Sequence, residues 1–314
     1  LNVYDIANTA DYWHEIINKI QDIAVKETRL GIPVLYGIDA IHGATYTKGA
    51  TLFPQAISMA ATWNTEIAKQ SGEITSLETK ASGIAWNYYP VMDIGRQPLW
   101  SRLWETFGED VYLASQMGAS YIKGAQGDDM SAPNKLATCL KHYVGYSFPI
   151  NGLDRTPAWI SERMMREYFL PTFEAGILAG SPSVMVNSGE VDGIPGHANY
   201  HLLTEVLRNE LNFKGLVVSD WEDIKRLHTR DGVASTPKEA VRISVMAGVD
   251  MSMVPYDFSF YNYLLELVNE GTVPMWRIDE AVSRILAVKM QVGLFANPYP
   301  NKELLKDFAK DEFT

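Results

Sequence analysis

The chain lacks several features that would assign it to a class of protein at once. It has one cysteine, Cys139, so a disulfide within the chain is excluded. No uncharged apolar run approaches the length that crosses a bilayer. The Gly-rich phosphate loops of nucleotide-binding folds and the Gly-x-Ser-x-Gly elbow of acyl-transfer enzymes are also missing. We therefore expect no membrane span and no cofactor.

Positive charge is in deficit. The 314 residues include 27 Lys and Arg against 38 Asp and Glu, which gives a formal net charge of −11 at pH 7. Such a chain repels polyanions, which argues against nucleic acid or acidic lipid as the main partner. A neutral or cationic small molecule fits better. With 46% hydrophobic residues, the chain can bury one large core, as a single barrel or as two ordinary domains.

One short apolar run ends in a carboxylate beside an indole. The run 216–218 has the composition of a strand buried on both faces of a parallel sheet, and Asp220 and Trp221 follow it. Residues just past such a strand are those that a βα loop presents to a ligand. Asp220 is therefore a candidate catalytic carboxylate, and Trp221 a candidate wall for the flat face of a sugar ring. The alternative for Asp220 is the N-cap of a helix expected over 221–228.

Strand-like and helical patterns alternate about seven times along the chain, and the strands repeatedly end in polar residues. A doubly wound sheet would concentrate its signature in one phosphate loop, whereas a closed barrel gathers polar strand ends at its C-terminal mouth. The sequence therefore predicts an α/β fold, a (β/α)8-like TIM barrel with one strand irregular or missing near 226–235. The runs counted toward the strands are 34–39, 56–61, 84–90, 136–140, 183–186, 216–218 and 249–253.

The pattern changes near the end of the chain. Asn297-Pro298-Tyr299-Pro300 breaks helix and strand alike, and the polar segment 301–314 has little to bury. We expect a barrel domain over residues 1–296 and the start of a linker over 297–314, leading to a further domain. The chain also begins at Leu1 rather than at a Met, which fits removal of a signal peptide.

The polar strand ends form a set that suits a sugar. If the strands close into a barrel, Asp39, Arg102, Lys141, His142 and Asp220 share one pocket. A carboxylate can accept hydrogen bonds from two adjacent hydroxyls while the cations donate to them. A carboxylate among cations has a lowered pKa and stays ionised, as a nucleophile requires. The alternative for Lys141 and His142 is a structural pair that holds loops at the barrel mouth.

Two spacings of histidine could indicate a metal site. Asp39 and His42 are three residues apart, and His197 and His201 are four apart. The second pair would be a ligand pair only on a helix that also gains a third ligand. The residues around it favour a loop or a helix start, so we expect no metal.

Several ordered motifs resemble the N-terminal barrel domain of glycoside hydrolase family 3, the β-glucosidase family. The resemblance covers nearly the whole chain, at matching separations. It rests on Tyr36-Gly37-Ile38-Asp39-Ala40-Ile41-His42-Gly43, Phe53-Pro54, Ala61-Thr62-Trp63, Arg96 to Arg102 with Glu105 and Gly108-Glu109-Asp110, Lys141-His142-Tyr143 and Ser219-Asp220-Trp221-Glu222.

The resemblance implies a function and a role for each matching residue. The function is hydrolysis of terminal non-reducing β-D-glucosyl residues by a retaining double displacement, in a periplasmic or secreted bacterial protein. Asp220 would be the nucleophile that forms a covalent glycosyl-enzyme, and Trp221 the wall of the first sugar subsite. The residues that would hold the glucose hydroxyls, line the site or border the nucleophile are Asp39, Arg102, Lys141, His142, Met185, Glu222 and Arg226.

The chain departs from the family pattern in three loops. Residues 96–102 read RQPLWSR where RDPRWGR is common, which puts the salt bridges of that loop in doubt. Asn187-Ser188 stands where many members have a Ser-Tyr pair whose Tyr contacts the nucleophile. The loop 145–156 has no histidine, so the Asp-x-His acid/base of the β-N-acetylglucosaminidases is absent and the glucosidase branch is favoured.

The general acid is missing from this set. The glucosidase branch takes a Glu from a second, α/β-sandwich domain, which this sequence does not contain; Glu190 and Asp192 are the local alternatives. Retaining hydrolysis needs two carboxyl groups about 5 Å apart, so we expect the chain by itself to be impaired. The rival functions are a family 3 glycosidase of other specificity, such as a β-xylosidase or β-N-acetylglucosaminidase, and a non-catalytic sugar-binding barrel.

Overall fold

The computed structural model describes residues 7–313, and in this range five strands form one parallel sheet in the order β1-β2-β3-β4-β7. Every residue of these strands is buried, as expected for a parallel sheet covered on both faces. The strands are β1 (Gly37–Ile38), β2 (Trp86–Asn87), β3 (Ala137–Tyr143), β4 (Ser183–Val186) and β7 (Leu216–Val218).

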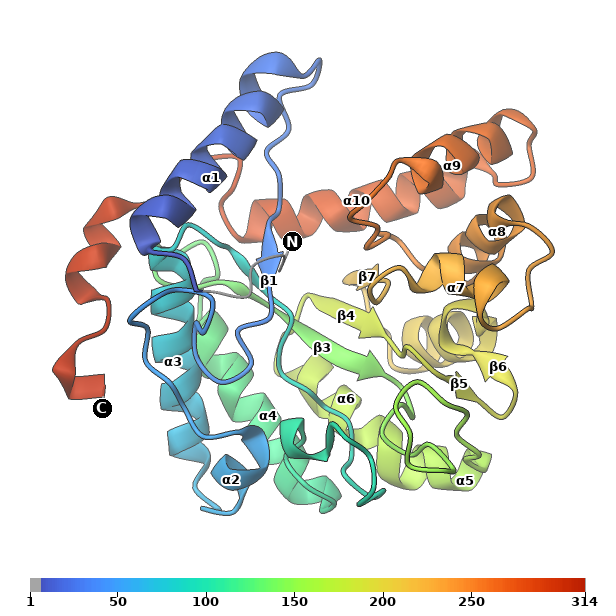
Figure 1. Ribbon diagram of the computed structural model, residues 1–314, viewed down its shortest axis with the longest axis horizontal. Coiled ribbons are helices and arrows are strands. Elements are labelled where there is room, and N and C mark those ends of the chain that lie inside the picture. The colour runs from blue at the N-terminus through green and yellow to red at the C-terminus, as the bar shows by residue number, and fades with distance from the viewer. Residues whose placement is uncertain (1–6, 314) are drawn as a thin grey trace.

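The sheet continues beyond β7 through a single parallel bridge between Val218 and Met251. The backbone N–H of Ser219 donates to the carbonyl of Met251 at 2.9 Å, so the strand predicted at 249–253 is reduced to this bridge. The segment 226–235 completes a helix and a turn without a strand. The predicted α/β barrel fold is confirmed in the form of a partial barrel, a curled parallel sheet with helices around it (Figure 1).

One apolar run was counted wrongly toward the strands. Residues 56–61 form a short helix, α2 (Ala56–Ala60), rather than a strand. The physical reason is composition, since Ala and Met are good helix formers and Ile57 is the one β-branched residue of the run.

Helices surround the strands (Figure 1). Several begin at a side chain that accepts a backbone N–H of the first turn, as Asn64, Asp110 and Thr236 do. The longer helices are α1 (Ala10–Asp22), α3 (Thr65–Ala81), α4 (Val111–Gln126), α6 (Leu170–Leu178), α7 (Asp223–Thr229), α8 (Pro237–Ala247), α9 (Ser259–Asn269), α10 (Met275–Gln291) and the segment His201–Glu210. Shorter elements are α5 (Glu162–Met164), the helical turns Ile23–Glu27, Leu103–Glu105, Met165–Phe169, Gly196–Ala198, Lys302–Asp307 and Asp311–Phe313, and the hairpin β5 (Glu190–Val191) and β6 (Ile194–Pro195).

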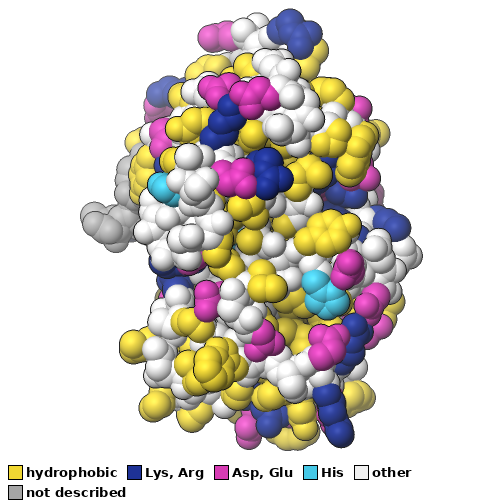
Figure 2. Space-filling model, turned by 90° about the vertical axis from the view of Figure 1, so that its right-hand side faces the viewer, with side chains coloured by type: hydrophobic (Ala, Val, Ile, Leu, Met, Phe, Trp, Pro, Cys, Tyr) yellow, Lys and Arg dark blue, Asp and Glu magenta, His cyan; other side chains and the backbone are white. Residues whose placement is uncertain are grey.

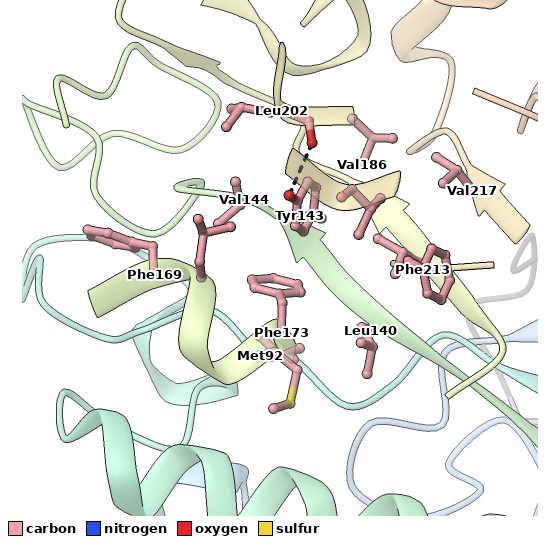
Figure 3. Close-up of a cluster of buried hydrophobic side chains, with 14 of the residues drawn as sticks. Met92, Leu140, Tyr143, Val144, Phe169, Phe173, Val186, Leu202, Phe213 and Val217 are labelled. Carbon is pink, nitrogen blue, oxygen red and sulfur yellow. Dashed lines mark hydrogen bonds between the residues drawn. The ribbon is translucent and has the colours of Figure 1, made fainter. Parts of the chain in front are cut away.

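The main core lies between the sheet and the helices around it, and Figure 3 shows part of it near β3. The rings of Tyr143 on β3 and Phe173 on α6 pack edge to face, with centroids 5.2 Å apart. The hydroxyl of Tyr143 donates to the carbonyl oxygen of Leu202 at 3.1 Å, so this buried polar atom has a partner. These contacts fix the end of β3 that carries Lys141 and His142.

A buried carboxylate fixes β7 near its amino-terminal end. Oδ2 of Asp250 accepts from the backbone N–H of Val217 at 3.0 Å and from Arg208 at 2.7 Å. Its Oδ1 accepts from Arg277 and Arg284, each at 2.9 Å. Three guanidinium groups compensate the cost of burying this charge, and the cluster ties β7 to α10 and to the helix 201–210.

The segment predicted as a linker contacts the barrel. The backbone N–H of Ala309 donates to Glu78 on α3 at 3.1 Å, the hydroxyl of Tyr299 donates to Asp22 at 2.9 Å, and Leu304 is buried. This segment therefore buries more than its polar composition indicates. The boundary near residue 297 and the domain beyond it stay predictions.

The surface carries charges of both signs. On the side of the molecule where α8 lies, acidic and basic side chains are interspersed with hydrophobic ones (Figure 2). Within residues 7–313, no helix is both long enough and apolar enough to cross a bilayer.

Two substitutions on α6 test the core. Phe173 is 1% exposed and Leu178 is 81% exposed. We expect Phe173→Ala to lower the free energy of unfolding by about 3–5 kcal/mol, because it leaves a cavity under β3. Leu178→Ala on the same helix should change it by no more than about 0.5 kcal/mol. Urea unfolding of both variants checks this, and equal effects would show that the α6 face is assigned wrongly.

Candidate active site

The carboxyl ends of the strands lead into one cavity of about 340 Å³. Parallel strands place these ends on the same edge of the sheet, so residues far apart in sequence meet there. The lining residues are Asp39, Ile41, Tyr46, Arg102, Glu105, Lys141, His142, Arg155, Met185, Asp220, Trp221 and Met253.

Seven of the nine residues expected at the site line this cavity, and Glu222 and Arg226 do not. Glu222 has a left-handed backbone (φ 58°) just before α7, and its side chain accepts from Lys225 at 3.2 Å. Arg226 forms an ion pair with Asp223 at 2.6 Å. Both residues therefore belong to the polar surroundings of the loop after β7 rather than to the cavity wall.

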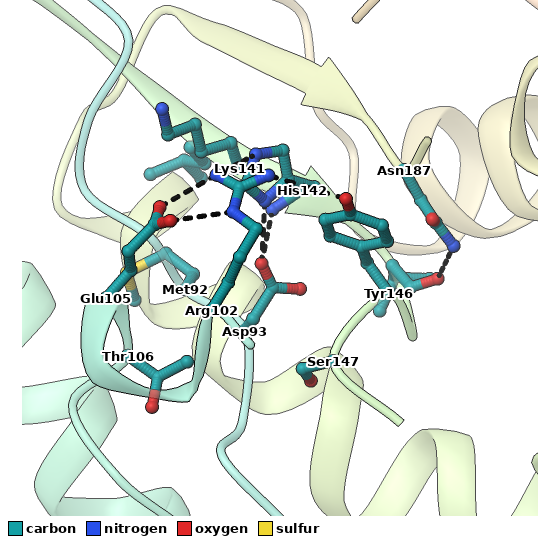
Figure 4. Close-up of polar contacts among 12 residues, drawn as sticks. Met92, Asp93, Arg102, Glu105, Thr106, Lys141, His142, Tyr146, Ser147 and Asn187 are labelled. Carbon is teal, nitrogen blue, oxygen red and sulfur yellow. Dashed lines mark hydrogen bonds and ion pairs between the residues drawn. The ribbon is translucent and has the colours of Figure 1, made fainter. Parts of the chain in front are cut away.

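Arg102 and His142 form one connected network (Figure 4). Arg102 donates from Nε and Nη2 to both carboxylate oxygens of Glu105, each at 2.7 Å, and also from Nη2 to Nε2 of His142 at 3.2 Å. A guanidinium can only donate, so Nε2 of His142 carries no proton and Nδ1 does. Nδ1 donates to Oδ2 of Asp93 at 2.8 Å, and the same oxygen accepts the backbone N–H of His142.

Burial and neighbouring cations keep His142 neutral. Desolvation lowers the pKa of His142 well below its usual value, and Arg102 and Lys141 add to the effect. Desolvation also raises the pKa of Asp93 to about 7. His142 is thus a neutral ring with a fixed tautomer, held in place from behind by a fully buried carboxyl group.

Lys141 forms the second ion pair of the cavity. Its Nζ donates to Oδ1 of Asp39 at 2.6 Å, with the lysine side chain 4% exposed and the aspartate 35% exposed. The pair joins the loop after β1 to the end of β3. The Lys141–Asp39 pair is therefore both a link between loops and part of the cavity wall. The loop after β1 also requires a glycine at position 43, because Gly43 has φ 102° and a Cβ there would lie 2.0 Å from the carbonyl oxygen of Thr51.

Asp220 has one bonded and one unbonded carboxylate oxygen. Its Oδ1 accepts the backbone N–H of Trp221 at 2.5 Å, whereas Oδ2 has no hydrogen-bond partner among residues 7–313. Its backbone N–H donates to Nε2 of His197 at 3.1 Å. Because α7 begins at Asp223 with Glu222 before it, Asp220 is not the N-cap of that helix.

The electrostatics of Asp220 differ from the expectation. We predicted a lowered pKa for a carboxylate among cations, and that prediction is wrong. Burial and the nearby charge of Asp223 raise the pKa of Asp220, and the opposing effects of Arg155 and Arg102 are smaller. Arg102 is already bound to Glu105, and Lys141 to Asp39, so these cations are engaged elsewhere.

The histidines at 197 and 201 do not act as a pair. His197 is buried at the backbone of Asp220, whereas His201 is exposed and bonded to Glu205 at 2.6 Å. Among residues 7–313, no group of three or more side chains has the arrangement of a metal site. His197 is instead a positioning residue for Asp220.

Other hydrogen bonds hold the loops that depart from the family pattern. Gln97 donates to the carbonyl of Pro149 at 3.1 Å, and Trp100 donates to Asp154 at 3.0 Å. Ser188, at the position of the expected Tyr, is buried and its hydroxyl accepts from Nε of Arg155 at 3.1 Å.

The two local candidates for the general acid lie outside the cavity wall. The residues that line the cavity include neither Glu190 nor Asp192. Oδ1 of Asp192 accepts the backbone N–H of Ile160 at 2.9 Å, which gives that carboxylate a structural role.

Four residues at or behind the cavity were not among the predicted site residues. Arg155 and Tyr46 line it in irregular loops, Glu105 anchors Arg102, and Asp93 anchors His142. Glu105 and Asp93 had a signal, since both belong to or adjoin the arginine-rich loop. Arg155 had none, because the loop 145–156 has no periodic pattern.

Comparison with known proteins assigns the family. Residues 7–288 match the model described as the glycosyl hydrolase family 3 N terminal domain. The chain belongs to glycosyl hydrolase family 3. The predicted family is thereby confirmed over most of the chain.

Relatives in this family carry names of two kinds. The lysosomal beta glucosidase of Dictyostelium discoideum is 51% identical over 296 residues, covering 92% of this chain and 36% of that protein. The periplasmic beta-glucosidase of Salmonella typhimurium is 35% identical, covering 90% and 36%. A beta-xylosidase of Formosa agariphila is 37% identical, covering 90% and 40%. The chain therefore spans between 36% and 40% of the length of these relatives.

Solved structures share the fold. A β-glucosidase from Erythrobacter marinus superposes with a TM-score of 0.92 at 35% identity, over 98% of this chain and 41% of that one. The β-glucosidase of Listeria innocua in complex with glucose gives 0.88 at 34% identity, over 94% and 40%. These similarities place the chain in the glycosidase family and leave its sugar preference open between the two names.

A pH-dependent measurement tests the position of His197. Burial lowers the pKa of His197 to about 4, below its unfolded value of 6.5. Between these two pH values the unfolded chain binds a proton at His197 and the folded chain does not. This stability contribution is fully present above pH 6.5 and is lost as the pH falls toward 4. The free energy of unfolding of His197→Gln, relative to that of the native protein, should therefore be about 2 kcal/mol higher at pH 5 than at pH 7.5.

Urea unfolding at both pH values gives the comparison, with His201→Gln on the exposed histidine as the matched control. A difference between His197→Gln and the native protein that is the same at both pH values would contradict the buried, neutral state of His197.

Proposed function

We propose that the chain is the catalytic barrel of a retaining, exo-acting β-glucosidase that removes terminal non-reducing β-D-glucosyl residues from β-glucosides or β-glucan oligosaccharides. The observation that supports this most is the cavity in which Asp220 and Trp221 meet Asp39, Arg102 and Lys141. Asp220 thus shares one cavity of about 340 Å³ with side chains that can hold vicinal hydroxyls.

Asp220 attacks the anomeric carbon in this mechanism. The backbone N–H of Trp221 fixes the carboxylate through Oδ1, whereas Oδ2 is buried and has no hydrogen-bond partner among residues 7–313. Burial disfavours the carboxylate charge, and that charge disappears when the glycosyl ester forms. Desolvation therefore favours the covalent intermediate over the free carboxylate. Water then opens the intermediate with retention of configuration.

The remaining groups hold the sugar. Asp39 accepts from hydroxyls, Lys141 and Arg102 donate to them, and the two ion pairs keep these side chains in fixed geometry. The ring of Trp221 packs edge to face against Tyr256, with centroids 5.8 Å apart, which fixes its orientation as a wall for the pyranose. Metal and cofactor have no part in this mechanism.

The general acid comes from outside this barrel in our proposal. Both other carboxylates of the cavity are bound to cations, Asp39 to Lys141 and Glu105 to Arg102. We propose that the sandwich domain implied by the family resemblance supplies a Glu at the barrel mouth. Without it, hydrolysis of an ordinary glucoside should be slower by about a hundredfold to ten-thousandfold.

Covalent trapping tests the nucleophile. We expect 2,4-dinitrophenyl 2-deoxy-2-fluoro-β-glucoside to label Asp220, because its leaving group departs without protonation and needs no general acid. Mass spectrometry of the digested protein locates the label, and Asp220→Asn should remain unlabelled. Label on another residue, or labelling of Asp220→Asn, would contradict the assigned role.

A panel of substrates tests the sugar preference. We expect the full-length protein to have a higher kcat/KM on an aryl β-glucoside than on the matching β-xyloside or β-N-acetylglucosaminide. The relative named a beta-xylosidase makes the xyloside the second candidate. A preference for the xyloside would replace the glucosidase assignment, and glucose binding without turnover of any substrate would favour a sugar-binding barrel.

A further inference from the structure

We propose that Lys80, Asn297 and Asn301 form a binding site for a small oxyanion, a carboxylate or a phosphate, at the end of the barrel opposite the candidate active site. The three residues line a cavity of about 110 Å³ that is separate from the one around Asp220. This inference does not depend on the proposed function, because it uses none of the residues assigned to hydrolysis.

The cavity lies where the segment after α10 crosses the floor of the barrel. Its wall includes the turns that lead into the amino-terminal ends of β2 and β3, together with residues of the range 292–301. The segment continues beside α3, where the backbone N–H of Ala309 donates to Glu78 (Figure 1). Gly83 allows the close approach, since it has φ 84° and a Cβ there would lie 2.5 Å from Cγ of Pro300. Backbone packing therefore forms the cavity before any ion enters.

Lys80 brings an unpaired positive charge to this cavity. It is half-buried in the last turn of α3, and its Nζ has no hydrogen bond or ion pair to any residue in the range 7–313. Burial lowers the pKa of Lys80, and no neighbouring carboxylate opposes the shift. A charge that is largely removed from water is costly unless it is paired, so an anion in the cavity would be stabilised beside it.

The usual role of a lysine at this position is already filled by other groups. A lysine in the last turn of a helix commonly donates to the last carbonyl groups. The carbonyl groups of residues 78–81 accept instead, in this order, from Ser82, Ile84, Gly83 and His14, at distances between 2.6 and 3.2 Å. Capping of α3 therefore does not account for the ammonium group of Lys80.

Two carboxamides supply further donors. Oδ1 of Asn297 accepts the backbone N–H of Tyr299 at 3.4 Å, and Oδ1 of Asn301 accepts that of Glu303 at 3.0 Å. Nδ2 of neither asparagine has a hydrogen bond to the described part of the chain, so each carboxamide has its acceptor occupied and its donors free. None of the residues that line the cavity is acidic. Three free donor groups without a carboxylate among them suit an oxyanion.

The size of the cavity limits the ligand. A water molecule takes about 30 Å³ in the liquid, so a cavity of about 110 Å³ has room for roughly four waters or for one small oxyanion. The cavity around Asp220 is about 340 Å³, three times as large, so the smaller one is not a second sugar site. A bound oxyanion would join α3 to residues 297–301 and thereby fix the course of the chain after α10.

The first test follows the reactivity of Lys80 in the full-length protein. Formaldehyde with a borane reductant methylates free amines, and mass spectrometry of the digested protein gives the rate at each lysine. We expect inorganic phosphate at about 50 mM to slow the methylation of Lys80 by at least about threefold relative to chloride at the same ionic strength, because the bound ion shields the amine in proportion to its occupancy. Lys123, exposed in the last turn of the neighbouring helix α4, is the matched control and should react equally fast in both salts.

The second test removes the charge. Lys80→Met keeps an apolar side chain in the last turn of α3, and Lys123→Met makes the same change on α4. We expect phosphate to raise the Tm of the native protein and of Lys123→Met relative to chloride, because an ion that binds only the folded state stabilises it. The rise should be absent in Lys80→Met.

Acetate in place of phosphate identifies the oxyanion. Protection of Lys80 by either ion, with Lys123 unaffected, supports the site and shows whether a carboxylate, a phosphate or both bind there. Failure of both ions to protect Lys80 would overturn the inference. Equal protection of Lys80 and Lys123, or a phosphate-dependent rise in Tm that persists in Lys80→Met, would also overturn it.

Discussion

The parallel backbone ladder from β1 to β7 is the constraint on which the site depends. It sets β3, β4 and β7 side by side in fixed register, with Leu140 beside Val184 and Val184 beside Val217. His142 and Asp220 therefore open into the same cavity, although they are far apart in the sequence. The strands are short, so the loops that follow them carry almost all of the chemistry. The order of the strands thereby sets the order of the functional groups around the mouth.

Charge pairing divides the cavity into two parts. On the side of β1 to β3, Lys141 with Asp39 and Arg102 with Glu105 form two ion pairs that keep polar side chains rigid. On the side of β7, Asp220 is buried, and among neighbouring charges the one that shifts its pKa most is another acid, Asp223. In the proposed mechanism, a sugar held by the first part presents its reacting carbon to the second. The cavity thus has a charge-paired part and a buried acidic part.

The strands were predictable from the sequence because short apolar runs rich in β-branched residues, such as 216–218, are typical of buried parallel strands. The polar groups at the ends of the strands were predictable with them. The short run 56–61 was misjudged, since a run of six residues, five of them apolar, does not distinguish a strand from a helical turn. The pKa of Asp220 was predicted in the wrong direction, because it depends on burial and on Asp223, neither of which a motif displays. Arg155 was unpredictable for a related reason, since an irregular loop reaches the cavity through contacts such as that with Ser188.

The cluster around Asp250 has a consequence for the opposite end of the barrel. Asp250 accepts the backbone N–H of Val217, three residues before Asp220, and is held by guanidinium groups from two helices. Any shift of that buried charge would be transmitted to Asp220 through three peptide units, with little chain in between to absorb it. The position of the Asp220 carboxylate thus depends on an ion-pair cluster outside the cavity, so changes in the floor of the barrel can disturb the site as well as changes at its rim.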